Sequence, residues 1–269
     1  MSRRHEEQPL FPDLFSIAGK TALITGGTSG IGLMMAEGYL RAGARVYICS
    51  RKPQACQSAQ DYLSEFGDVH AIAADVSDED QCRTLIDAVG ARESALHILI
   101  NNAGATWGAP FDSFPGAAFD KVLTLNVKTP FLLTQLARPL LEAASTEDDP
   151  ARVINIGSID GLTVPRLHTF SYSASKAALH QLTRHLAYEL APSVLVNAIA
   201  PGPFPSKMMA ATLEAAGDRL AAATPVRRIG RTEDIAAAAV YLASRATNFM
   251  TGAVLPLDGG LSTTMGLNS

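Results

Sequence analysis

Tyr172 and Lys176 have the residue types and the spacing that proton transfer requires. They lie four residues apart, which places both side chains on one face of a helix. A tyrosine with a pKa of about 10 is a poor acid at neutral pH, and a lysine ammonium one turn away favours the phenolate and lowers that pKa. The pair predicts a general acid–base tyrosine, although a half-buried tyrosine beside a surface lysine has the same spacing.

A glycine-rich turn at 25–32 predicts a phosphate site. It follows a predicted strand and opens a predicted helix, so its glycines let the backbone approach a pyrophosphate while helix N–H groups face the charge. The spacing Gly-xxx-Gly-x-Gly differs from the usual Gly-x-Gly-xx-Gly, which indicates a separate branch of dinucleotide-binding proteins. An ordinary glycine turn is the alternative. The residues expected to contact the cofactor are Gly26, Thr28, Ser29, Gly30, Ile31 and Gly32.

The tip of the second predicted strand favours NADP(H) over NAD(H). NAD-selective sites place a carboxylate there, where it accepts hydrogen bonds from the adenine ribose. This strand ends instead on Ser50, Arg51 and Lys52, and a hydroxyl with two cations suits the 2′-phosphate of NADP(H). A solvated basic pair at the start of a loop is the alternative. Asp75 lies too far along the chain to replace the missing acid, and with Val76 it is expected to border the adenine.

The elements that must position these residues alternate between short apolar runs and longer amphipathic stretches. Continuous apolar runs fit strands buried on both faces, because half-exposed antiparallel strands would alternate apolar with polar residues. The sequence therefore predicts an α/β fold with a doubly wound parallel sheet of the Rossmann type, whose ligands lie at the carboxyl ends of the strands. The predicted strands are 21–25, 46–50, 69–73, 98–101, 153–156, 195–199 and 253–257, and the predicted helices are 31–42, 79–89, 119–141, 175–190 and 232–243.

Composition predicts one domain without nucleic-acid or membrane partners. The 269 residues show no repeat and no Gly/Ser linker, so we expect an N-terminal arm at 1–18 and a single Rossmann domain at 19–269, with a helical substrate lid at about 203–225. A net charge of −4 gives no general attraction to nucleic acid or anionic lipid. No apolar run has membrane-spanning length. Three cysteines without CxxC spacing fit reduced thiols in the cytoplasm better than disulfides or a metal site.

Further motifs, in order along the chain, make up a family resemblance. Asn101-Asn102-Ala103-Gly104 follows the fourth predicted strand, Asn126 lies in a predicted helix, Ser158 follows the fifth strand, and Pro201-Gly202 follows the sixth. Together with the glycine turn and the Tyr/Lys pair, these motifs make the sequence resemble the short-chain dehydrogenase/reductase family. The similarity extends from about residue 19 to residue 260, which is nearly the whole chain.

The resemblance implies a role for each of these residues. Tyr172 would be the general acid in reduction and the base in oxidation, while Lys176 would lower its pKa and hold the nicotinamide ribose. Ser158 would bond the substrate oxygen, where alkoxide charge develops, and Asn126 would bend its helix and hold a water that passes protons to Lys176. The other residues that would contact the cofactor are Asn102, Ala103, Gly104, Pro201, Gly202 and Ser206. Ser158 and Tyr172 are fourteen residues apart, one more than is commonest in the family.

The substrate is the least determined part of the prediction. Segment 201–208 is similar to the lid of β-ketoacyl (3-oxoacyl) reductases related to those of rhamnolipid biosynthesis, which implies NADPH-dependent reduction of a 3-oxoacyl thioester to a secondary alcohol. A dehydrogenase of a sugar, polyol or other secondary alcohol stays open, as does a non-catalytic dinucleotide-sensing scaffold, which usually loses the Tyr or Lys. Residues expected to border an apolar cleft are Trp107, Phe111, Leu162, Pro165, Phe204, Met208, Met209 and Leu213. Arg166, Lys207, Arg227 and Arg228 would suit a carrier's phosphopantetheine, although scattered surface cations are the ordinary interpretation.

The resemblance also implies a homodimer or a homotetramer, with helix 175–190 as the expected contact between copies. The sequence does not distinguish these two assemblies. It also leaves open the physiological direction, and whether the acyl group is carried by coenzyme A or by a carrier protein.

Overall fold

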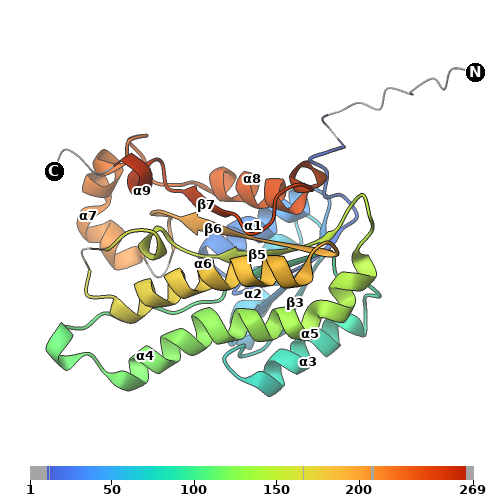
Figure 1. The fold of residues 1–269 in the computed structure, drawn as a ribbon, viewed down its shortest axis with the longest axis horizontal. Coiled ribbons are helices and arrows are strands. Elements are labelled where there is room, and N and C mark those ends of the chain that lie inside the picture. Colours follow the sequence, from blue (N-terminus) through green and yellow to red (C-terminus); the bar gives the residue numbers. More distant parts are fainter. Residues whose placement is uncertain (1–10, 12, 166, 207–208, 265–269) are drawn as a thin grey trace, which may run out of the picture.

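Seven parallel strands form the sheet, and helices cover both of its faces (Figure 1). The computed structural model describes residues 11, 13–165, 167–206 and 209–264. The strand order is β3-β2-β1-β4-β5-β6-β7, with the reversal at β1 and β4 that a doubly wound sheet requires. The predicted fold class is therefore confirmed. The strands are β1 (Thr21–Thr25), β2 (Arg45–Ser50), β3 (Val69–Ala73), β4 (Ile98–Asn101), β5 (Ala151–Ile156), β6 (Val194–Pro201) and β7 (Val254–Leu257).

The strands lie close to their predicted positions because the apolar runs are the buried strands. β1, β4, β5 and β6 are buried over their full length, as expected for a parallel sheet covered on both faces. β6 is longer than the predicted run 195–199, because it continues to Pro201 beside the edge strand β7.

The helices differ from the prediction in several places, among them the short α9, which was not expected. The predicted helix 119–141 is two helices joined by a π-helical turn, η2 (Thr124–Lys128). The predicted helix 175–190 begins earlier, at Phe170. No helix was expected at α2, whose buried residues are mostly small and give a weak apolar pattern. The α-helices are α1 (Gly30–Arg41), α2 (Pro53–Leu63), α3 (Glu79–Gly90), α4 (Gly116–Leu123), α5 (Thr129–Ala144), α6 (Phe170–Leu190), α7 (Ala210–Ala223), α8 (Thr232–Ala243) and α9 (Leu261–Thr264). Within the part of the chain that the structure describes, none of them has the length and apolar character of a membrane span.

Two hydrophobic cores lie on opposite faces of the sheet. The first packs α1, α2 and α8 against it, and the second packs α3, α5 and α6. Neighbouring residues of one strand enter different cores: Ala22 and Ile24 belong to the first, and Leu23 belongs to the second. Figure 1 shows α7 at the same end of the molecule as the beginning of α6, so the segment predicted to be a lid lies at the carboxyl edge of the sheet.

A buried polar ladder crosses from the sheet to α6. Asn101 Nδ2 donates to Asn155 Oδ1 at 2.9 Å, and Asn155 Nδ2 donates to the Thr183 hydroxyl at 2.9 Å. Asn101 Nδ2 also donates to the Thr134 hydroxyl of α5 at 3.3 Å. Asn101 and Asn155 are partners in the register of β4 and β5. Because buried amides need hydrogen-bond partners, the ladder holds β4, β5 and α6 in one alignment.

Buried cations lie at the amino ends of the strands, opposite the candidate site. Lys20 Nζ donates to Asp149 Oδ1 at 2.7 Å and to the carbonyl of Ala243, the last residue of α8, at 3.3 Å. The buried guanidinium of Arg152 donates to the carbonyl of Ser244 at 3.2 Å. Burial lowers the pKa of both Lys20 and Arg152. The two cations stabilise the carboxyl end of α8, where the helix dipole favours positive charge.

The end of the predicted N-terminal arm packs onto the domain. Ile17 is fully buried in the first core, and the Phe15 ring stacks on Tyr241 with 6.1 Å between centroids. The Ala246 amide donates to the Leu14 carbonyl at 2.9 Å. The residues just before 19 are thus part of the packed body.

Candidate functional site

The glycine turn between β1 and α1 has the geometry of a phosphate-binding turn. Gly26 and Gly30 have φ of +65° and +57°, which residues with side chains rarely adopt. A Cβ on Gly32 would overlap the carbonyl oxygen of Gly26, so the turn needs glycine there too. Ser29 is the N-cap of α1, and its side chain makes no capping bond to the described residues. The first N–H groups of α1 can therefore bind an anion such as a dinucleotide pyrophosphate.

Asn102 and Thr25 fix this turn against β4. Asn102 Nδ2 donates to the carbonyls of Thr25 and Gly26, at 2.8 and 3.3 Å. The Thr25 hydroxyl accepts from the amides of Asn102 and Ala103, both at 3.0 Å. The segment expected to line the adenosine is thus also the segment that shapes the phosphate turn.

The tip of β2 carries a weakly paired cation. Arg51 lies 3.9 Å from Asp75, and both side chains are partly exposed, so this ion pair contributes little. Asp75 is held more firmly by the Ser77 hydroxyl, at 2.7 Å. Burial would raise the pKa of Asp75, but the Ser77 bonds and the Arg51 charge lower it overall. Ser50 is half-buried and Val76 is buried beside them. Arg51 can turn toward a phosphate without breaking a strong contact.

The structure brings Tyr172, Lys176 and Ser158 together at the carboxyl end of β5. Lys176 is buried, and its Nζ donates to the carbonyl of Ile156, the last residue of β5, at 2.7 Å. Tyr172 lies one turn earlier on α6, with its ring centroid 5.5 Å from that Nζ. The Ser158 hydroxyl accepts from the Asp160 amide at 3.1 Å, and it lies close enough to the phenol of Tyr172 to lower the pKa of that group.

Asn126 joins this group from the π-helical turn. Its Oδ1 accepts from the Ala105 amide at 2.8 Å, and its Nδ2 donates to the Ala105 carbonyl and to the Ser175 hydroxyl, both at 2.9 Å. A Cβ on Gly104 would lie 3.2 Å from Asn126 Oδ1 and 3.8 Å from Lys176 Nζ. The π turn therefore places a buried amide between the loop after β4 and the helix that carries Lys176.

The pKa of Tyr172 moves in the opposite direction from the one expected from its spacing to Lys176. Burial raises it to about 12, and Asp160 acts in the same direction, while the bond from Ser158 lowers it. Burial also lowers the pKa of Lys176 to about 8, against the attraction of Asp160. The Lys176 ammonium donates to the Ile156 carbonyl and not to the phenol, so burial has the larger effect on the pKa of Tyr172. The phenol is protonated at neutral pH, as a proton donor must be.

Asp160 is a charged residue of the site that the sequence reasoning did not single out. Burial raises the pKa of its carboxyl, against the charge of Lys176, and Asp160 in turn affects the pKa of both Tyr172 and Lys176. Its only signal in the sequence was its position two residues after Ser158.

Segment 201–206 runs from β6 to the glycine turn. Pro201 ends β6, and Gly202 packs so closely on Asp258 that a Cβ would lie 2.7 Å from the aspartate Cβ. A Cβ on Gly30 would lie 3.0 Å from the Ser206 Cβ. The Ser206 hydroxyl accepts from the Met209 amide at 3.2 Å, just before α7. Ser206 therefore touches the phosphate turn and also helps to start α7.

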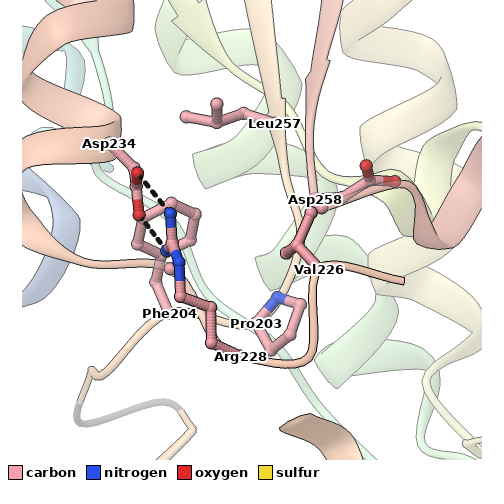
Figure 2. A pocket seen from close by; sticks show the side chains of 9 residues that line it. Pro203, Phe204, Val226, Arg228, Asp234, Leu257 and Asp258 are labelled. Carbon is pink, nitrogen blue, oxygen red and sulfur yellow. Dashed lines mark hydrogen bonds and ion pairs between the residues drawn. The ribbon is translucent and has the colours of Figure 1, made fainter. Parts of the chain in front are cut away.

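Phe204 was expected to border an apolar cleft as part of the helical lid, but it packs into the body of the domain instead. It precedes α7, is only 2% exposed, and presses on Gly230, where a Cβ would overlap its ring. With Val226 it lines a cavity of about 150 Å³, shown in Figure 2. The Arg228–Asp234 ion pair borders this cavity, with a bond of 2.9 Å. Arg228 is therefore engaged within the chain and does not reach out to a carrier.

The other residues expected at the lid fall into two groups. Leu213 and Arg227 line a groove of about 630 Å³ between α7 and the beginning of α8. Arg166, Lys207 and Met208 lie outside the described residues.

Three phenylalanines form an apolar surface at the start of α6, which we call the aromatic wall. Phe170 begins α6, and its ring lies 5.7 Å from those of Phe111 and Phe114, edge-on to both. Phe111 is 76% exposed, so the wall faces solvent. Other exposed apolar residues of the two loops that carry it are Trp107, Leu162, Val164 and Leu167. An apolar ligand that covered this surface would lie at the start of the helix that carries Tyr172.

Comparisons with known proteins identify the family of this chain. Residues 26–262 match the family model described as enoyl-(acyl carrier protein) reductase. The rhamnolipids biosynthesis 3-oxoacyl-[acyl-carrier-protein] reductase of Pseudomonas aeruginosa is 48% identical, over 91% of this chain and 97% of its own length. The Pseudomonas aeruginosa RhlG/NADP active-site complex superposes with a TM-score of 0.89 at 47% identity, over 93% of this chain and 99% of that one. Gluconate 5-dehydrogenase of Gluconobacter oxydans is 35% identical, over 94% of this chain and 99% of its own. The chain belongs to the short-chain dehydrogenase/reductase family.

Proposed function

We propose that this protein reduces the keto group of a 3-oxoacyl thioester with NADPH. The observation that carries the proposal is the grouping of Ser158, Tyr172 and Lys176 at the carboxyl end of β5, on the same edge of the parallel sheet as the phosphate-binding glycine turn after β1. The exposed aromatic wall lies at the start of the helix that carries Tyr172. NADPH supplies the hydride when it is bound, and the protein supplies binding, orientation and the proton.

Each residue of the group has one task in this reduction. Tyr172 donates its proton to the carbonyl oxygen of the substrate as that oxygen gains negative charge. Ser158, which lies near the phenol, donates a hydrogen bond to the same oxygen and stabilises the charge. Lys176 holds the cofactor ribose and stabilises the phenolate left after proton transfer. Asn126 holds a water from which a proton reaches Lys176. In oxidation, Tyr172 acts as the base.

Arg51 sets the preference for NADPH. A phosphate bound to a guanidinium at the tip of β2 gains charge-assisted hydrogen bonds that NADH cannot form. Arg51→Ala should weaken NADPH about tenfold to a hundredfold and leave NADH nearly unchanged, because one such bond contributes about 1.5–3 kcal/mol. Fluorescence titration with both cofactors measures this. Arg83→Ala, an exposed cation on α3, is the control. A wild-type protein that binds NADH as tightly as NADPH would refute the cofactor assignment.

The aromatic wall favours an acyl chain over a sugar or a polyol. An acyl chain would remove the exposed Phe111 and its neighbours from water, which is favourable. A polyol lying on the same rings would lose hydrogen bonds to water without gaining partners. The relative that is 48% identical is named for a 3-oxoacyl substrate, and the gluconate 5-dehydrogenase is more distant at 35%. Both facts support the acyl substrate.

Catalytic efficiency should therefore rise with acyl chain length until the wall is covered. The increase should be at most about fourfold per methylene, because burying one CH₂ contributes about 0.8 kcal/mol. Phe111→Ser should flatten the trend and leave the shortest substrate unaffected. Phe249→Ser, which removes an exposed ring outside the wall, is the matched control. Efficiency independent of chain length, or faster turnover of polyols, would remove the acyl part of the proposal and leave the hydride transfer intact.

Three further points belong to the proposal. α7 is the substrate lid, which the contact of Ser206 with the phosphate turn supports. Copies of the chain associate as a dimer or tetramer through α6, where Tyr188 is 86% exposed. The protein works in the reducing cytoplasm, where Cys49, Cys56 and Cys82 remain the buried free thiols that they are here.

A further inference from the structure

His180 lies on the same face of α6 as the reacting residues. Tyr172, Lys176 and His180 follow one another at intervals of four, so their side chains form a row along the helix. His180 is 2% exposed, and neither ring nitrogen has a hydrogen-bond partner among the described residues. A buried polar group without partners is unfavourable and requires an explanation. Burial and the charges of Lys176 and Arg184 lower the pKa of His180 to about 4, against the nearby backbone of Gly161, which acts in the opposite direction, so the ring is neutral at pH 7.

The outer edge of this ring touches both ends of the turn that carries Ser158. A Cβ on Gly157 would overlap His180 Nε2 and lie 2.8 Å from Cδ2. A Cβ on Gly161 would lie 2.9 Å from His180 Cε1. Nε2, Cδ2 and Cε1 are neighbouring atoms of the imidazole, so one edge of the ring spans the turn from Gly157 to Gly161. The Gly157 amide donates to the Ile199 carbonyl at 2.7 Å, which ties this end of the turn to β6.

The contact of the His180 ring with Gly157 and Gly161 links the turn that carries Ser158 to α6, the helix that carries Tyr172. Gly157 precedes Ser158 directly, so a shift of the ring moves the peptide that carries the serine. Gly161 also rests on α6 itself, because its Cβ would lie 2.6 Å from the carbonyl carbon of Lys176. The distance between the serine turn and α6 is therefore set by backbone contact at Gly161 and by the imidazole at Gly157.

We propose that His180 is a positioning residue, whose ring holds the Ser158 hydroxyl at the level of the Tyr172 phenol. The inference rests on the proposed function, since it concerns the two groups that bind the reacting oxygen. A small side chain at 180 leaves a gap under Gly157, into which the turn can sink. The Ser158 hydroxyl then moves away from the phenol, although the cofactor site at the glycine turn is untouched.

The first test compares kinetic constants of His180→Ala and wild type. We expect kcat to fall about tenfold to a hundredfold, as displacement of a reacting group by about 1 Å does. KM and the affinity for NADPH should stay within about twofold, which separates this effect from loss of binding. His180→Gln, whose planar amide can fill the same gap, should restore most of kcat. His185→Ala, an exposed histidine on the same helix, should behave as wild type.

The pH profile gives a readout that a merely structural role would not move. The Ser158 bond lowers the pKa of Tyr172, whereas burial and Asp160 raise it. Loss of that bond should shift the alkaline limb of kcat to higher pH in His180→Ala, in the same direction as in Ser158→Ala. Lys176 and Asp160 also face the phenol, and neither is changed in these variants.

A pair of glycine variants tests the contact itself. Gly157→Ala should lose activity through overlap with His180, and His180→Ala should recover part of it in the double variant. The Cβ of Gly161→Ala would overlap the α6 backbone, so adding His180→Ala to this variant should not restore its activity. A folded His180→Ala variant with normal kcat would overturn this inference. So would a variant whose kcat and melting temperature both fall while the alkaline limb of its pH profile does not shift. Neither result would affect the proposed function. A wild-type protein inert toward every carbonyl and alcohol would overturn the proposed function as well.

Discussion

Tyr172→Phe should lower turnover by a factor on the order of a hundred or more and leave NADPH affinity nearly intact. The variant removes one hydroxyl from a half-buried ring, so the packing at the start of α6 is preserved while the proton donor is lost. Steady-state kcat with a 3-oxoacyl thioester and the dissociation constant of NADPH, measured on the same preparation, check both halves of the expectation.

Lys176→Ala supplies the contrast to that result. It should reduce both turnover and NADPH affinity, because Lys176 is buried between the Ile156 carbonyl and the loop at Gly104, where the cofactor ribose is proposed to bind. Tyr188→Phe, on the exposed side of the same helix, should change neither quantity. Near-normal turnover of Tyr172→Phe would remove Tyr172 from the catalytic assignment.

Asp149→Asn should lower the free energy of unfolding by about 3 kcal/mol, the low end of the range for breaking a buried ion pair. The substitution leaves Lys20 and Arg152 buried without the carboxylate that, among the residues described, pairs with both. Asp149 itself is 28% exposed, which is why the low end applies. Because these cations lie at the amino ends of the strands, kcat at low temperature should be unchanged. Urea unfolding followed by circular dichroism measures the difference.

Glu142→Gln is the matched control for Asp149→Asn. The Arg138–Glu142 pair has the same 2.7 Å separation as Lys20–Asp149, but both of its side chains are about half exposed. Solvent screens such a pair, so its loss should leave the urea midpoint within experimental error. Equal effects of the two substitutions would show that burial does not set the strength of these pairs.

Much of this architecture could be predicted from the sequence because its signals are local. A continuous apolar run specifies a buried strand, and the runs ending at Thr25, Ser50 and Ile156 are strands that end there. Glycines that a turn requires sterically, such as Gly26 and Gly32, are visible as a motif for the same reason. Parallel strands bring their carboxyl ends to one edge, so residues that follow them were expected to lie together.

The features that could not be predicted depend on contacts between distant segments. Phe204 looked like a lid residue, but Gly230, far along the chain, leaves room for its ring in the core. The pKa of Tyr172 was expected to fall because the spacing to Lys176 is local, whereas the burial that raises it is a property of the whole fold. The role of His180 could not be predicted from the sequence, because it depends on contacts with Gly157 and Gly161 in another loop.

The ladder of Asn101, Asn155 and Thr183 has a consequence for how this enzyme can diversify. A slip of β5 by one residue would turn all of its side chains to the opposite face and leave these amides without partners, so the strand has a single admissible setting. Ser158 lies three residues beyond Asn155, and Lys176 lies two helical turns before Thr183. The relative positions of Ser158 and Lys176 are thus set by Asn101, Asn155 and Thr183, which are buried in the sheet and in α6. The loops above can exchange side chains or change length, and a new substrate range can arise on them while the reacting geometry is inherited unchanged.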